Sequence, residues 1–315
     1  MAGKLIILCG PTATGKTRLG VALAQRLNGE VVSADSMQVY RDLAIGTARP
    51  TQEEMEGVPH HMLAVADPRE NYSVARYVQE ATACVEDIFR RGRQPIVVGG
   101  TGLYIDALRR GRTFSDFRPD SGSRARLQAQ ASQPGGLAAL WQRLEQIDPE
   151  SAARLHPNDE KRILRALEVW YDTGKTISQH DRETRDLPPR YQAVTLALTY
   201  RDRQDLYRRI DQRVDVMMAR GLADEVRALL AAGVPRTGTA MQAIGYKELV
   251  HALDTGGDLA QAAEEIKLRS RQYAKRQLTW FRRDPAIKWM LLEKEYNFSS
   301  LVQASTDYLR EKGLP

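Results

Sequence analysis

At 315 residues the chain is long for one hydrophobic core, so we expect either two domains or one domain with a large insertion. Its 42% hydrophobic and 27% charged residues are typical of a globular protein. We expect it to be cytoplasmic, since no apolar run approaches membrane-spanning length and no signal peptide precedes the first strand. Two cysteines exclude a disulfide-rich fold, and a net charge of +6 is compatible with a polyanionic partner without indicating one.

The first predicted element is a strand, loop and helix at the start of the chain. Residues 4–9 form a short apolar strand, and leucines recur at helical spacing from residue 19 to residue 27. The segment between them fits G-x-x-x-x-G-K-[ST], a loop whose backbone N–H groups bind phosphate; it reads Gly10, Pro11, Thr12, Ala13, Thr14, Gly15, Lys16, Thr17. We expect Lys16 to neutralise terminal phosphate oxygens and the Thr17 hydroxyl to ligate Mg²⁺. The loop predicts a diphosphate-type ligand without identifying it.

A second strand, predicted over residues 30–38, ends in a polar turn that contains Asp35. Ligands in open α/β sheets lie beyond the carboxyl ends of the strands, so we expect Asp35 near the phosphate loop. An ordinary turn carboxylate remains the alternative at this stage. Ser73 and Gly92 then bracket a predicted helix as its N-cap and its terminating glycine.

The strand that starts at residue 95 ends in Gly99-Gly100-Thr101-Gly102. A phosphate-loop NTPase would usually end this strand in an Asp that positions Mg²⁺, so its absence counts against a standard ATPase. Glycines let a ligand approach the backbone closely, and the Thr101 hydroxyl is a natural contact for it. The carboxylate nearest any Mg²⁺ stays undetermined.

Between about residues 111 and 191 strand patterns disappear and helical patterns take over, which predicts a helical insertion. Lys161, Arg162 and Arg165 lie on the polar flank of an apolar helix face there. They form either a solvated basic face or a set of phosphate contacts.

Residues 192–199 again show the pattern of a strand. A long helix that carries Arg209 and Arg213 follows, and either guanidinium could reach an anion. A polar–aromatic turn at residues 240–248 leads into another helix. The last predicted helix, residues 264–283, carries two basic stripes, one with Lys267 and Arg271 and one with Arg276, with aromatics between them. Such stripes indicate either nucleic-acid binding or an ordinary charged face.

Together these segments resemble the tRNA dimethylallyltransferases, or isopentenyl-tRNA transferases, in their bacterial form. The resemblance runs in order from about residue 5 to residue 283. Besides the phosphate loop it rests on Asp-Ser-Met-Gln-Val-Tyr at 35–40, Ile-Gly-Thr-Ala at 45–48, Pro-His-His at 59–61, Gly-Gly-Thr-Gly-Leu-Tyr at 99–104, Ala-Ile-Gly-Tyr at 243–246 and Arg-Gln-Tyr-Ala-Lys-Arg-Gln at 271–277.

The resemblance implies an α/β fold, with a P-loop NTPase-like parallel sheet flanked by helices and an inserted all-helical domain. Residues 1–111 and 191–315 would form the catalytic core, and residues 112–190 a helical domain that contacts tRNA. It also implies transfer of a dimethylallyl group from dimethylallyl diphosphate to N6 of adenosine 37, beside the anticodon of tRNAs that read codons starting with U. The resemblance implies Mg²⁺ as the cofactor, and we expect a monomer with no membrane association.

Roles for individual residues follow from the same resemblance. Asp35, at the neighbouring strand end, would accept the N6 proton, and Thr101 would assist. From its place on the helix, and not from the resemblance, we expect Arg213 to join the loop in binding diphosphate. The adenosine must be flipped out of its stack to react, and the residues implied to hold it and the adjoining RNA are Asp35, Ser36, Met37, Gln38, Thr101, Ser123, Lys161, Arg162, Ile163, Leu164, Arg165, Gln242, Ala243, Ile244, Gly245, Tyr246 and Lys247.

Three other functions are compatible with parts of the pattern. A small-molecule kinase would use ATP and Mg²⁺ on the same loop, although the strand at residue 95 lacks its usual Asp. An isopentenyltransferase acting on free adenine nucleotides would share the chemistry but would not need the insertion. A non-enzymatic RNA-binding protein could retain the loop as a relic.

Overall fold

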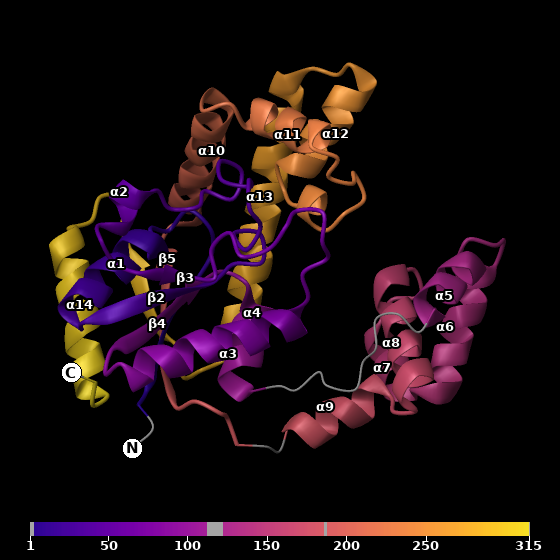
Figure 1. The fold of residues 1–315 in the computed structure, drawn as a ribbon, viewed down its shortest axis with the longest axis horizontal. Helices are drawn as coiled ribbons and strands as arrows, with labels where there is room; N and C mark the ends of the chain where they lie inside the picture. The colour runs from indigo at the N-terminus through magenta and orange to yellow at the C-terminus, as the bar shows by residue number, and fades with distance from the viewer. Residues whose placement is uncertain (1–2, 112–121, 186–187, 315) are drawn as a thin grey trace. The chain divides into compact units, whose positions relative to one another are not determined.

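The structure, a computed structural model, describes residues 3–111, 122–185 and 188–314. The chain divides into two compact units: unit 1, Met1–Gly111 with Arg190–Pro315, and unit 2, Arg112–Pro189 (Figure 1). The first ten residues of the predicted insertion, 112–121, lie outside the described residues. Over the described part of the chain, every helix is too short or too polar to cross a membrane.

Unit 1 contains a single six-stranded sheet in the order β3-β2-β4-β1-β5-β6, with every neighbouring pair parallel, as the sequence predicts. Every residue of β1, β2 and β4 is buried, which requires helices on both faces of the sheet. The strands are β1 (Leu5–Cys9), β2 (Gly29–Ala34), β3 (His60–His61), β4 (Gln94–Gly99), β5 (Ala193–Tyr200) and β6 (Lys288–Leu292).

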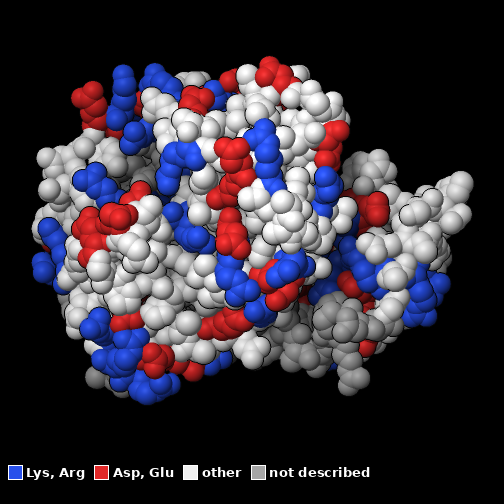
Figure 2. Space-filling model, turned by 45° about the horizontal axis from the view of Figure 1, so that its top comes forward, with Lys and Arg blue, Asp and Glu red and all other residues white. Residues whose placement is uncertain are grey.

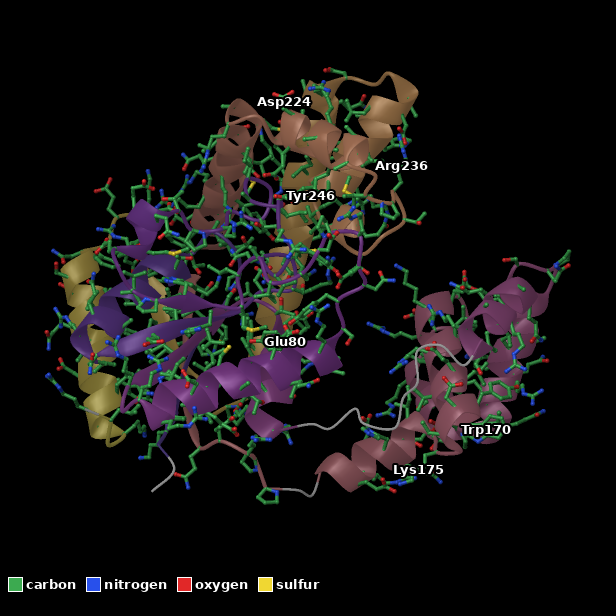
Figure 3. All side chains as sticks on the ribbon, in the orientation of Figure 1. Glu80, Trp170, Lys175, Asp224, Arg236 and Tyr246 are labelled. Atoms are coloured by element: carbon green, nitrogen blue, oxygen red, sulfur yellow. The ribbon has the colours of Figure 1, made fainter. Side chains whose placement is uncertain are left out.

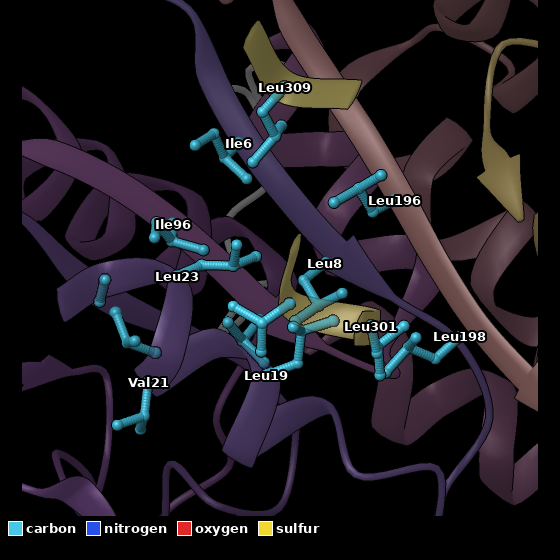
Figure 4. Packing of buried hydrophobic residues seen from close by; sticks show 14 of the residues in the cluster. Ile6, Leu8, Leu19, Val21, Leu23, Ile96, Leu196, Leu198, Leu301 and Leu309 are labelled. Atoms are coloured by element: carbon cyan, nitrogen blue, oxygen red, sulfur yellow. The ribbon is translucent and has the colours of Figure 1, made fainter. Parts of the chain in front are cut away.

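Helices cover both faces of this sheet. One face packs Ile6 and Leu8 of β1 against Leu19 and Leu23 of α1 and against Leu301 of α14 (Figure 4). The other face packs against α3 and α4. The helices of unit 1 are α1 (Lys16–Arg26), α2 (Gln52–Met55), α3 (Val74–Arg90), α4 (Gly102–Arg110), α10 (Arg203–Ala219), α11 (Leu222–Ala231), α12 (Tyr246–Thr255), α13 (Leu259–Phe281), α14 (Phe298–Glu311) and the 3₁₀ turn η1 (Ala240–Gln242).

Within the described residues of unit 2, all secondary structure elements are helices. Leu140 and Leu144 of one helix and Ile163 and Leu167 of another are fully buried and form its own small core. The helices are α5 (Ser123–Ala131), α6 (Gly136–Ile147), α7 (Pro149–Arg154), α8 (Glu160–Thr173) and α9 (Ile177–Arg185).

Side-chain caps and a glycine mark the ends of several helices. The Ser73 hydroxyl accepts the backbone N–H of Arg76 at 3.2 Å, which confirms it as the N-cap of α3. Gly221, at φ 90°, separates α10 from α11. The helix predicted from residue 264 begins earlier, at Leu259, where the Asp258 side chain caps it through the N–H of Ala260.

Candidate active site

Three predicted site segments follow three neighbouring strands. The phosphate loop follows β1, the Gly-Gly-Thr-Gly turn follows β4, and Asp35 follows β2, in the sheet order β2-β4-β1. The neighbouring strand end expected for Asp35 is therefore wrong, because β4 lies between β2 and β1, but Asp35 does lie near the loop, and both line one small cavity. Gly99 permits this close arrangement, since a Cβ there would strike the carbonyl oxygen of Ala34.

The phosphate loop has a backbone that side chains would obstruct. Gly10 has φ 131° and Gly15 has φ 80°, and a Cβ on Gly10 would strike the carbonyl oxygen of Leu198. The Thr14 hydroxyl donates to the carbonyl of Pro11 at 3.0 Å, and Lys16 Nζ donates to the same carbonyl at 2.6 Å. These bonds hold the loop in a tight turn before the N-terminus of α1.

Two cations and one carboxylate meet beside the loop. Lys16, Arg213 and Asp35 line one small cavity of about 150 Å³ together with the loop residues. Burial, and to a smaller extent the nearby Arg213, lower the pKa of the Lys16 ammonium to about 8, while Asp35 opposes the shift. Burial also lowers the pKa of Arg213. An anion in this cavity would relieve the repulsion between the two cations.

Asp35 is held by its own turn. Its Oδ1 accepts the backbone N–H groups of Met37 at 2.9 Å and Gln38 at 3.3 Å, while Oδ2 has no hydrogen-bond partner among the described residues. Thr101 Oγ1 accepts the N–H of Ser36 at 3.1 Å, which fixes the next residue of the same turn. One carboxylate oxygen is thus anchored and the other is available to take a proton.

A second cavity of about 300 Å³ adjoins the first. Thr12, Asp35, Arg213 and Tyr273 line both cavities. The second cavity is more apolar, and its walls include Ile210, Val214, Met217, Ile244 and Ile266. The arrangement places an anion site and an apolar site beside one carboxylate.

Two site residues on α13 have functions that sequence patterns do not indicate. Gln277 is buried, accepts the Thr12 N–H at 3.0 Å and donates to the Gly100 carbonyl at 2.9 Å, so it joins the loop to the β4 turn. Tyr273 lies one helical turn earlier and interacts with Thr101 and Gln277; burial and then Asp35 raise its pKa to about 12. The signals in the sequence were their place in the motif at residues 271–277 and their spacing of four residues, and neither indicates these contacts.

The residues of the smaller cavity could hold Mg²⁺ only if a bound substrate supplied further oxygen ligands. Thr17 lines the smaller cavity and offers one hydroxyl oxygen. Within the described ranges, no three His, Cys, Asp or Glu side chains are grouped to hold a metal. Mg²⁺ commonly completes its shell with phosphate oxygens and water, so a hydroxyl beside a diphosphate site suits it.

The predicted RNA-binding residues of unit 1 mostly line the larger cavity. Ser36 and Met37 do so, as do Gln242, Ala243, Ile244 and Gly245, whereas Gln38 lines the smaller cavity. Tyr246 is fully buried and donates to Glu225 Oε1 at 2.5 Å, so direct contact between its side chain and RNA is corrected to a structural role. Lys247 is exposed and outside the lining.

In unit 2 the predicted RNA-binding residues divide by exposure. Lys161 and Arg162 are exposed, and Arg162 pairs with Asp159 at 3.0 Å. Arg165 is partly buried and contacts Glu168 at 3.1 Å. The side chains of Ile163, Leu164 and Ser123 are buried, and the first two pack in the core of the unit, which argues against side-chain contact with RNA. That these residues contact RNA stays a prediction.

The basic stripe on α13 is largely neutralised within the chain. Lys267 lies 2.7 Å from Asp215, and Arg271 lies 2.6 Å from Asp211, both on α10. On the face drawn in Figure 2, Lys and Arg side chains are likewise interspersed with Asp and Glu. The charged-face alternative therefore describes this stripe better than a free nucleic-acid surface.

The fold and the site define an α/β protein of the phosphate-loop class with a second, adjoining cavity. A family model described as IPP transferase matches residues 38–284, and one described as isopentenyl transferase matches residues 3–69. The tRNA dimethylallyltransferase of Caldanaerobacter subterraneus subsp. tengcongensis is 45% identical over 313 residues, 99% of each chain. That of Carboxydothermus hydrogenoformans is 46% identical over 314 residues, covering 100% of this chain and 99% of the relative.

Solved structures give the same relationship. The full-length tRNA isopentenylpyrophosphate transferase of Bacillus halodurans matches with a TM-score of 0.74 at 43% identity, over 98% of this chain and 96% of that one. A eukaryotic dimethylallyltransferase acting on tRNA matches with a TM-score of 0.81 at 33% identity, over 98% and 80% of the two chains. The chain belongs to the IPP transferase family.

Proposed function

We propose that this protein transfers a dimethylallyl group from dimethylallyl diphosphate to N6 of adenosine 37 in tRNA, beside the anticodon. The observation that carries the proposal is the position of Asp35, which lines both the anion cavity and the apolar cavity. Family membership supports it, because relatives covering the whole chain are tRNA dimethylallyltransferases. We further propose that it acts in the cytoplasm as a monomer, since one chain supplies both cavities.

The residues divide the reaction between the two cavities. The loop amides, Lys16 and Arg213 bind the diphosphate and stabilise the charge that grows on it as the C1–O bond breaks. The apolar wall accommodates the five-carbon group and the flipped adenine. N6 attacks C1, the Oδ2 atom of Asp35 accepts the N6 proton, and diphosphate leaves. Thr17 would hold Mg²⁺ together with the diphosphate oxygens, and the ion would neutralise part of their charge.

The assay uses dimethylallyl diphosphate labelled in its prenyl group, Mg²⁺ and unmodified tRNA carrying A36-A37-A38. We expect label in the RNA, located at A37 by nuclease digestion. A matched tRNA with guanosine at position 37 is the control and should remain unlabelled. Transfer only to free AMP or ADP would favour the free-nucleotide enzyme, and hydrolysis of ATP without prenyl transfer would favour a kinase.

A further inference from the structure

Glu225, a carboxylate on α11, lies outside both cavities. Glu225 Oε2 accepts the backbone N–H groups of Ala44 at 2.9 Å and Ile45 at 2.8 Å, and Oε1 accepts that of Gly46 at 3.1 Å. A fourth donor, the Tyr246 hydroxyl, reaches Oε1 at 2.5 Å. One side chain therefore binds three successive amides of a distant loop and the first residue of α12.

The loop that Glu225 holds forms one wall of the larger cavity. Gly46 and Thr47 line that cavity directly. The carbonyl of Thr47 accepts Nε2 of Gln38 at 3.1 Å and Nη2 of Arg213 at 3.4 Å, so the loop also orients two predicted site residues. A displacement of the loop would move the cavity wall and both of these side chains.

A second part of the cavity wall is attached to the same carboxylate. Gln242, Ala243, Ile244 and Gly245 line the larger cavity, and Tyr246 follows them directly. Figure 3 labels Tyr246 inside the group formed by α11, α12 and α13, and Asp224 at its outer edge. Burial raises the pKa of Tyr246, so it keeps its proton and remains a donor to Glu225. A Cβ on Gly46 would lie 2.5 Å from the Tyr246 ring, which shows how closely the two parts of the wall approach.

The loop does not hold its shape by local propensity. Asp42 and Ala48, on either side of the bonded amides, have φ values of 63° and 44°, a left-handed conformation that is rare for residues other than glycine. Such backbone persists only where the surroundings fix it. The loop's own bonds, such as that from the Thr47 hydroxyl to the Leu43 carbonyl at 2.6 Å, give part of that constraint, and the three amide bonds to Glu225 add to it in the centre of the loop.

We infer that Glu225 is a positioning residue that fixes the loop at residues 44–46 and the turn before Tyr246 relative to each other, and so shapes the larger cavity for the flipped adenine. The inference rests on the proposed function for its substrate. It assigns Glu225 mainly to nucleobase acceptance, because the smaller cavity is lined by neither Glu225 nor residues 44–46, and the loop meets a diphosphate-binding side chain at Arg213.

The test compares Glu225→Gln and Tyr246→Phe with Asp224→Asn as the matched control. Asp224 is the neighbouring carboxylate on α11, is exposed, and pairs only with Arg227 among the described residues. Glu225→Gln replaces one acceptor oxygen by an NH₂ group that faces N–H donors, whereas Tyr246→Phe removes a single hydroxyl. We expect kcat/KM for tRNA to fall about 10- to 100-fold in Glu225→Gln, less in Tyr246→Phe, and to stay unchanged in Asp224→Asn.

Two further measurements separate positioning from general damage. The affinity for inorganic diphosphate with Mg²⁺ should be unchanged in Asp224→Asn and should fall much less than kcat/KM in the other two variants, because Arg213 meets the loop through a single bond of 3.4 Å. An anticodon stem-loop with 2-aminopurine at position 37 should show a smaller fluorescence increase with Glu225→Gln than with the control, because fewer bases are held in the cavity. If diphosphate affinity falls as far as kcat/KM, or if the fluorescence matches the control, the positioning role is refuted.

Hydrogen exchange keeps the test independent of activity. The amides of residues 44–46 should exchange faster in Glu225→Gln and Tyr246→Phe than in Asp224→Asn. Unchanged exchange in both variants would refute the inference even if the wild-type protein transfers label. A wild-type protein that shows protected amides but transfers no label would instead refute the proposed function. If Glu225→Gln fails to fold, Tyr246→Phe carries the comparison alone.

Discussion

Asp35 has its two carboxylate oxygens in different surroundings, one bound by the turn and one open towards the cavities. Asp35→Asn keeps the shape and an acceptor oxygen for the turn but removes the base. We expect kcat to fall about 10²- to 10⁴-fold, the usual contribution of a general base. Single-turnover transfer of labelled dimethylallyl to tRNA measures this, and filter binding should give an unchanged Kd for tRNA. Lost binding with retained turnover of the bound complex would contradict the assignment.

Lys16 gives the site a pH dependence at the alkaline end. Its pKa is lowered to about 8, mainly by burial, so it loses its proton within the range of an ordinary assay. The protonated form binds the anion, and kcat/KM for the diphosphate substrate should therefore fall as pH rises above about 8. Lys16→Arg keeps its charge because arginine does not titrate there, so its profile should lack this limb. An unchanged alkaline limb in that variant would place the titration elsewhere.

The phosphate loop could be predicted because its motif lies within eight consecutive residues, and their own backbone forms the site. Gln277 could not, because its contact with Thr12 joins residues 265 positions apart. Glu225 is similar: it follows Asp224 in an ordinary helix, and only the fold shows that one of the two is bonded to residues 44–46. Long-range hydrogen bonds leave no period or spacing in the sequence.

At the scale of elements, one buried carboxylate joins β2 to β3 and to the end of α3. Glu30 has a side chain only 2% exposed, accepts Nη2 of Arg91 at 2.8 Å, and lies 2.7 Å from His61 Nε2. The hydrogen bonds from Arg91 outweigh burial and, with His61, lower the pKa of Glu30 to about 2. These contacts connect one edge of the sheet to the helix that covers it.

Glu30→Gln should therefore destabilise unit 1 by about 2 kcal/mol near neutral pH, the size of hydrogen bonds to a charged group. Because the folded pKa lies below the unfolded one, the wild-type advantage exists above about pH 4.5 and is lost as pH falls towards about 2. Urea unfolding of both proteins at pH 7, 4.5 and 3 measures the gap. A gap that stays constant over this range would show that charge contributes nothing to it.

Elements with their own caps and periodicity were predictable, and elements defined by tertiary contacts were not. The apolar side of α3 and the cap at Ser73 were both readable in the sequence. No helix or strand is predicted beyond residue 283, yet β6 forms the last strand of the sheet and α14 packs on one of its faces. β6 is an edge strand with mixed exposure, so it lacks the continuous apolar run of a central strand. The stripe on α13 was ambiguous because Asp211 and Asp215 are on another helix.

At the scale of the whole molecule, the described lining of both cavities comes from unit 1 alone. Unit 2 has its own core and carries the exposed Lys161 and Arg162. The division suggests separate tasks, with diphosphate handling in unit 1 and RNA affinity shared with unit 2. In unit 1, the chain segments before and after unit 2 are joined by a hydrogen bond from the Tyr191 N–H to the Arg109 carbonyl at 3.2 Å.

Because these two chain ends are already joined by a hydrogen bond, replacing residues 112–189 with a short Gly-Ser linker should leave unit 1 folded. We expect the variant to bind inorganic diphosphate as the full chain does, while transfer to tRNA falls about 10²-fold or more through lost phosphate contacts. In the full chain, Lys161→Ala with Arg162→Ala should weaken tRNA binding and reduce its salt slope by about 1 to 2. Lys175→Ala, which removes an exposed cation paired with Glu183 in the same unit, is the control and should change neither. Transfer by the shortened protein at the full rate would mean that unit 1 recognises tRNA by itself, and unit 2 would then need another function.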